Sequence, residues 1–114
     1  MTWFTPVSPR FARVVRFDDE GFTIVAGKGN SARVPWDDVN EVIGFKSDLL
    51  TVDEICLGFG VATGGDSIAV GEEDIGFEEF RAETERRFGI DAAWFGKIMK
   101  PAFAANRTIL WQRT

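Results

Sequence analysis

The segment from Glu54 to Ala62 constrains the fold most, because its side chains alternate strictly in size. The large apolar residues take every second position: Ile55, Leu57, Phe59 and Val61. The positions between them hold small residues: Cys56, Gly58, Gly60 and Ala62. Since successive side chains of a strand project from opposite faces, this pattern predicts a strand with one bulky face and one face suited to close packing.

Further short apolar segments, separated by turn residues, also predict strands. They cover residues 11–17, 22–26, 32–35, 42–46 and 68–70. Asp18-Asp19-Glu20-Gly21 and Gly27-Lys28-Gly29-Asn30 have the residues of tight turns, so we expect hairpins there. At Trp36-Asp37-Asp38 the alternation stops, which favours a single helical turn or a corner.

Helical spacing appears only after residue 76. Large or β-branched residues recur three and four positions apart, at Phe77, Phe80, Thr84 and Phe88. Gly76 and Gly89 bound this segment, and Gly89 is well placed to end the helix. A second helix is predicted from Asp91 to Lys100, with Asp91 as its cap and Pro101 after it.

The 114 residues form one domain, 1–114, and the length allows one core. We predict an α+β fold in which a strongly curved antiparallel sheet of about six strands, a roll or barrel, is followed by two C-terminal helices that cover it. The 11 phenylalanines and 4 tryptophans, with no tyrosine, suit an interior filled by rings without polar atoms to satisfy.

Composition excludes several classes of function. The chain has no histidine and one cysteine, so it lacks the residues for Ser-His or Cys-His nucleophiles and for an intramolecular disulfide. The net charge of −5 and pI near 4.7 disfavour nucleic acid and anionic membranes as partners. No apolar run is long enough to span a bilayer, and no secretory signal is recognisable. We expect a cytoplasmic, non-enzymatic protein without a cofactor.

Two groups of residues are candidates for protein binding. Trp36, Asp37 and Asp38 would present a tryptophan beside two acids at a corner, although core packing explains Trp36 equally well. Trp94, Phe95 and Met99, together with Ile98, span more than one helical face, and the excess apolar area predicts a homodimer. The acidic surface favours a basic protein partner.

Other candidates have simple structural alternatives. Three acids lie close together in the sequence: Asp48, Asp53 and Glu54. Their oxygens could bind a hard cation, or two of them could act as a catalytic pair in hydrolysis. Their spacing instead favours solvated carboxylates of a loop. Cys56 is expected to be a buried apolar side chain and not a reactive thiol. The acids Glu72, Glu73, Asp74, Glu78 and Glu79 suit the N-terminal end of a helix.

As an alternative to protein binding, a small apolar or lipid-like ligand would lie between the sheet and the helices. The residues expected to line that pocket are Phe59, Phe80, Phe88 and Trp94.

The order of elements carries a resemblance. The hairpins, the Val34-Pro35-Trp36-Asp37-Asp38-Val39 corner and the helix opened by Gly76 together resemble bacterial PH-like domains over residues 11–88. The stretch from Glu54-Ile55-Cys56-Leu57 through Trp94-Phe95 to Leu110-Trp111 is also similar to a family of small bacterial proteins of uncharacterised activity. The resemblance implies a fold with seven strands. The second resemblance carries no known activity. Some small acidic bacterial domains of this kind are immunity proteins against secreted toxins, which offers an immunity-protein-like role by analogy only.

Overall fold

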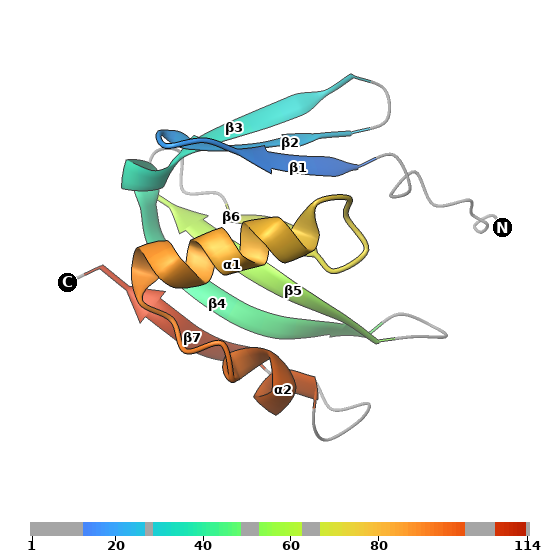
Figure 1. The fold of residues 1–114 in the computed structure, drawn as a ribbon, viewed down its shortest axis with the longest axis vertical. Coiled ribbons are helices and arrows are strands. Elements are labelled where there is room, and N and C mark those ends of the chain that lie inside the picture. The colour runs from blue at the N-terminus through green and yellow to red at the C-terminus, as the bar shows by residue number, and fades with distance from the viewer. Residues whose placement is uncertain (1–12, 27–28, 49–52, 63–66, 100–106, 114) are drawn as a thin grey trace, which may run out of the picture.

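The computed structural model describes residues 13–26, 29–48, 53–62, 67–99 and 107–113. Within these ranges the chain forms seven strands, two α-helices and one short 3₁₀ turn (Figure 1). In chain order they are β1 (Val14–Phe17), β2 (Gly21–Val25), β3 (Ser31–Pro35), the 3₁₀ turn (Trp36–Asp38), β4 (Val39–Asp48), β5 (Asp53–Val61), β6 (Ser67–Gly71), α1 (Phe77–Phe88), α2 (Trp94–Met99) and β7 (Arg107–Gln112).

The first sheet is an antiparallel meander in the order β1-β2-β3. Asp18 shapes its first turn, because its Oδ1 accepts hydrogen bonds from the backbone N–H groups of Glu20 (2.9 Å) and Gly21 (3.0 Å). Arg33, on β3, donates to the same carboxylate at 2.8 Å. Gly21 is required here, since a Cβ at this position would lie 2.4 Å from the carbonyl oxygen of Val34.

The second sheet has the order β6-β5-β4-β7, and every neighbouring pair is antiparallel. Its strand β5 confirms the prediction for residues 54–62. Leu57 and Phe59 are fully buried on the bulky face. On the opposite face, a Cβ at Gly58 would lie 2.9 Å from Cγ1 of Ile43. Because Gly58 has no side chain, the side chain of Ile43 can lie across β5.

The two sheets meet at the 3₁₀ turn (Figure 1), and their aromatic rings form one core. Phe22 of β2 lies 4.8 Å from the ring of Phe59 on β5 and 4.9 Å from that of Phe80 on α1. Trp36 contributes from the turn, with its ring centroid 5.1 Å from that of Phe22. These four rings join both sheets and the first helix, which confirms that the second half of the chain packs over the strands around a shared interior.

Both helices lie where the periodicity predicts them. Phe77, Phe80 and Thr84 are the buried face of α1, as expected. Gly76 and Gly89 flank the helix with φ values of 91° and 67°, a conformation that favours glycine. The second helix is shorter than its predicted range of 91–100, whose last residue lies outside the described part. Neither helix, as described, is long and apolar enough to cross a membrane.

The predicted α+β fold with antiparallel strands and two helices is confirmed, but the strands do not form one strongly curved sheet of about six. The described strands form two open sheets, with β1, β3, β6 and β7 at their edges, and no roll or barrel closes. A seventh strand, β7, follows the helices and pairs with β4. The alternation of apolar residues predicts no strand in this segment, although it contains Ile109, Leu110 and Trp111. Because β7 and β4 are far apart in the sequence, local alternation does not identify the partner strand.

Gly44, on β4, provides a test of the packing between the second sheet and α2. A Cβ at this position would lie 2.7 Å from the ring of Trp94, so Gly44→Ala should destabilise the fold by about 1–3 kcal/mol. A Cβ at Gly96 meets nothing within 4 Å, so the matched change Gly96→Ala should stabilise α2 by about 0.5–1 kcal/mol. Urea unfolding of both variants measures this difference, and equal stability would contradict the packing described.

The Asp18–Arg33 pair predicts a pH dependence of stability. The hydrogen bond from Arg33 lowers the pKa of Asp18 from 3.8 to about 2. Because the folded pKa is the lower one, the pair stabilises the folded chain above pH 3.8, and this contribution is lost as the pH falls through about 2. Arg33→Ala should therefore lower the urea midpoint near neutral pH and have little effect near pH 2. If Arg33→Ala lowers the urea midpoint by the same amount at both pH values, ionisation of the Asp18 carboxylate is not the cause of the lost stability.

Candidate functional site

The structure places the first predicted site, at the corner, mostly inside the molecule. Trp36 is only 6% exposed, and its indole N–H donates to the carbonyl oxygen of Asp18 at 2.9 Å. The guanidinium of Arg87 lies 4.7 Å from the centre of its ring. Asp37 is exposed and Asp38 is half-buried. Of the two alternatives for Trp36, its burial and contacts match core packing at the corner.

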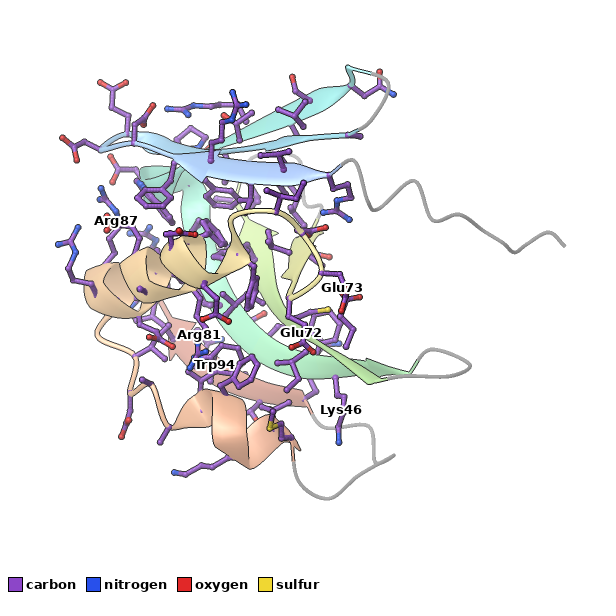
Figure 2. The ribbon with its side chains drawn as sticks, turned by 45° about the vertical axis from the view of Figure 1, so that its right-hand side comes forward. Lys46, Glu72, Glu73, Arg81, Arg87 and Trp94 are labelled. Atoms are coloured by element: carbon purple, nitrogen blue, oxygen red, sulfur yellow. The ribbon has the colours of Figure 1, made fainter. Side chains whose placement is uncertain are left out.

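The second predicted site divides between two sides of α2. Trp94 is 5% exposed, and its indole N–H donates to Oε2 of Glu85 at 2.7 Å. The guanidinium of Arg81 lies 4.2 Å from the ring centre of Phe95, and Figure 2 shows Arg81 and Trp94 together between the two helices. Met99 is 51% exposed and lies four residues after Phe95, on the same side of the helix. The predicted apolar group is therefore not one continuous exposed surface.

A groove lies beside this helix, and we call it the α2–β7 margin. It has a volume of about 410 Å³. Its lining residues come from the connection between α1 and α2, from α2 and from β7: Ile90, Asp91, Trp94, Lys97, Ile98, Thr108, Ile109 and Leu110. Trp94 and Ile98 are buried, whereas Ile109 is 56% exposed. The groove thus has an apolar wall supported by the core and an open side.

The margin borders the free edge of β7. Thr108, Ile109 and Leu110 are consecutive residues, and consecutive side chains of a strand project to opposite faces. The register of β7 against β4 shifts between Trp111 and Ile109, so Leu110 lies at an irregularity in the strand and strict alternation does not hold there. Within the described residues β7 is the last strand of its sheet, with β4 as its only strand neighbour.

The lining of the margin has balanced charge. Lys97 is its one cation and Asp91 is its one acid. Arg107 lines a separate cavity over β4, β5 and β6. Arg113 donates to the backbone oxygens of Asp37 (3.0 Å) and Val39 (2.6 Å), at the corner between the sheets. The lining is therefore close to neutral on a chain whose net charge is −5.

The acids predicted near the strand ends hold loops in place. Oε1 of Glu72 accepts from the N–H of Ile55 at 3.0 Å, and Oε2 of Glu54 accepts from the N–H of Glu73 at 3.1 Å. Oδ2 of Asp74 accepts from the N–H of Gly71 at 3.0 Å. These bonds fasten the β6–α1 connection to the start of β5, on the side of the molecule where Figure 2 labels Glu72 and Glu73.

These acids do not assemble into a metal site within the described residues. No group of three potential ligands occurs there, and the side chains of Asp48 and Asp53 lie outside that part. Cys56 is 5% exposed, with Sγ 3.8 Å from the carbonyl oxygen of Glu54. This burial agrees with its predicted role as an apolar side chain.

The residues expected to line an internal ligand pocket pack against one another or lie apart. Phe59 and Phe80 are fully buried with ring centroids 5.6 Å apart, and Phe88 stacks near Trp111 at 4.5 Å. Trp94 lines the α2–β7 margin instead. The space between sheet and α1 that a ligand would occupy is therefore filled by these rings.

Sequence reasoning missed Lys97 and the role of β7 in this site. The apolar run Ile109-Leu110-Trp111 was a usable signal for a strand, but nothing local indicated that its edge would be open. Comparison with family models, curated proteins and solved structures gives no match to this chain. The resemblance to bacterial PH-like domains therefore stays a prediction.

The bond between Trp94 and Glu85 predicts which residues fix α2 in place. Trp94→Phe keeps the ring packing but removes a hydrogen bond to a partly buried carboxylate, so it should cost about 1–2 kcal/mol. Met99→Ala, at an exposed position of the same helix, should change stability by no more than about 0.5 kcal/mol. Thermal or urea unfolding compares the two. A larger loss of stability in Met99→Ala than in Trp94→Phe would mean that α2 is held in place through the side that carries Met99.

Proposed function

We propose that this protein is a non-catalytic protein-binding domain and that its docking surface is the α2–β7 margin. The observation that carries the proposal is an open groove with a buried apolar wall beside a strand that, among the described residues, pairs on one side only. Grooves of this kind bind protein segments, because they have both apolar area and backbone hydrogen-bonding groups. Immunity proteins, to which the sequence analysis compares the chain, are one class that acts by binding another protein.

A non-catalytic role is supported by composition and by burial. The chain lacks histidine, and its one cysteine is buried in the strand β5. The acids Glu54, Glu72 and Asp74 are engaged with backbone N–H groups. The small-ligand alternative has no specific observation in its favour, since the rings assigned to it fill the core or lie at the margin.

The proposal places binding on one side of α2. Trp94, Lys97 and Ile98 face the groove, whereas Phe95 and Met99 share a different side of the helix. Ile109 adds the most exposed large apolar side chain of the groove. A partner at the margin would therefore contact Lys97 and Ile109 and would leave Met99 accessible.

Site-specific photo-crosslinking in the native cells tests this placement. A benzoylphenylalanine in place of Ile109 or Lys97 should form one discrete adduct with another protein. The same group at Ile75 is a matched control, because Ile75 and Ile109 are 55% and 56% exposed. It should form no such adduct, and neither should the group at Met99.

Each other outcome of this experiment counts against the proposal. Adducts from Met99 alone would show that binding takes place on the side of α2 that carries Met99, as the sequence analysis predicts, and not at the margin. Equal amounts of adduct from Ile75 and Ile109 would indicate nonspecific contact with other proteins and not binding at the margin. No adduct at Ile109 or Lys97 would remove the margin as a docking surface.

A further inference from the structure

We propose that the outer face of the second sheet is an interface between two copies of this chain. The outer face is the side of β4, β5, β6 and β7 that is turned away from both helices. The inference goes beyond the proposed function, because the margin lies beside α2 and this face lies on the other side of the sheet. It is carried by a hollow in the face, by its apolar middle row and by the placement of its charges.

The inner side of this sheet is the one that the helices cover. A Cβ at Gly44 would lie 2.7 Å from the ring of Trp94 on α2, and the ring of Phe59 lies 5.6 Å from that of Phe80 on α1. Figure 1 shows both helices on one side of the sheet. The residues that alternate with Gly44 and Phe59 along β4 and β5 therefore project from the outer face.

The outward residues form three rows across the sheet, because residues directly opposite each other on paired strands share a face. The first row holds Glu41, Gly60 and Ser67; the middle row holds Ile109, Ile43, Gly58 and Ala69; the third row holds Arg107, Phe45, Cys56 and Gly71. The register shift of β7 lies outside these pairs, between Ile109 and Trp111. The rows are therefore regular over all the strands that contribute to them.

The outer face is hollowed over its small residues. A cavity of about 370 Å³ lies there, and its lining residues all come from β4, β5, β6 and β7. Gly58 and Gly60 belong to the lining, and Ile43 and Phe45 beside them are only half-buried. At the end of the middle row Ile109 is 56% exposed. The face thus presents apolar side chains that a second surface could bury.

The charges of the face lie at its opposite ends. Glu41 is in the first row and Arg107 in the third, about 13 Å apart along the strands. Among the described residues neither of them has an ion-pair partner. Lys46 also lines the cavity, but it is 7% exposed and its Nζ donates to the carbonyl oxygen of Met99 on α2 at 3.1 Å. Its charge therefore lies on the inner side.

This arrangement is complementary to itself. Two copies can pack face to face about a twofold axis that lies between the sheets and runs perpendicular to the strands. The middle row of one copy then lies over the middle row of the other, and each first row lies over a third row. Glu41 of each copy therefore faces the row that contains Arg107 of the other, so that two ion pairs form across the interface.

The other face-to-face arrangement lacks this match. A twofold axis parallel to the strands would place each row over the same row of the second copy. The two Glu41 carboxylates would then lie near each other without a cation, and like charges that face each other are destabilising. The charges therefore select one orientation, and the occupant that fits it is a second copy of this chain. The homodimer predicted from Trp94, Phe95 and Met99 would use a different surface.

Sedimentation velocity of the full chain over about 1–500 µM tests this interface. We expect a dimer whose fraction rises with concentration. Glu41→Arg and Arg107→Glu should each raise the dimer Kd at least about 10-fold, because each places like charges across the interface twice. Glu79→Arg on α1 and Lys97→Glu on α2 reverse exposed charges away from this face, so they are matched controls and should change the Kd no more than about 2-fold.

Mixing the two variants separates this interface from a general effect of charge. The Glu41→Arg face carries two cations and the Arg107→Glu face carries two acids, so each variant repels itself and complements the other. An equimolar mixture should form heterodimers about as tightly as the natural chain forms homodimers. Native mass spectrometry identifies the heterodimer by its mass. The double variant, in which the two charges are exchanged, should dimerise as well.

A crosslinking measurement keeps the inference testable if a charge reversal prevents folding. Arg107→Lys retains the positive charge and supplies an amine that a carbodiimide can join to a carboxylate. In a mixture of ¹⁵N-labelled and unlabelled chains of this variant, the peptide with Glu41 should be joined to position 107 of a chain with the other label. Such a mixed-label peptide can arise only between two copies.

The remaining outcomes overturn the inference. A monomer over the whole concentration range, equal losses in the control variants, a mixture that stays monomeric or the absence of mixed-label peptides would each reject this interface. The proposed function would still stand, because adducts from Lys97 report on the margin. Ile109 borders both surfaces, and an adduct from it with a second copy is recognised by a mass twice that of the chain.

Discussion

The contact between Phe22, Trp36 and Phe80 is the interaction on which the rest of the structure depends. It joins β2 of the first sheet, the 3₁₀ turn between the sheets and the helix α1, with ring centroids 4.9 to 6.0 Å apart. Without this contact, two open sheets of three and four strands would not be expected to pack together. Rings with no polar atoms fill this space efficiently, and the indole N–H of Trp36 is satisfied by the carbonyl oxygen of Asp18.

Because the interior is filled in this way, the surfaces left for function lie at the edges of the sheets and on the outer face of the second sheet. One face of β5 packs into the core, and the side of α2 with Trp94 and Ile98 is buried against the second sheet. The groove along β7 combines an unpaired backbone with an apolar wall. Its lining holds one cation, Lys97, and one acid, Asp91, whereas three acids, Asp18, Asp19 and Glu20, lie together at the first turn, so the charge of the chain is unevenly distributed. The net charge alone therefore does not identify the sign of the charge at the docking surface.

Elements defined by local chemistry were predictable from the sequence. The hairpin at Asp18, the turn at Trp36 and the glycine-bounded helix α1 all depend on residues within a few positions of one another. The strand β7 and its place in the sheet were not predictable, because pairing with β4 joins distant parts of the chain. The candidate site was predictable only in part, since Trp94 was identified, whereas Lys97 and the open edge of β7 were not.

The sequence by itself determined the first six strands, the two helices and the apolar face of each, because alternation and helical spacing are local consequences of backbone geometry. Only the tertiary structure decided that the described strands form two open sheets, that Trp36 is buried, and that β7 is the last described strand of its sheet, next to α2. The physical reason is that periodicity sets the direction of each side chain relative to its own element. The neighbour that covers the side chain depends on how distant elements pack.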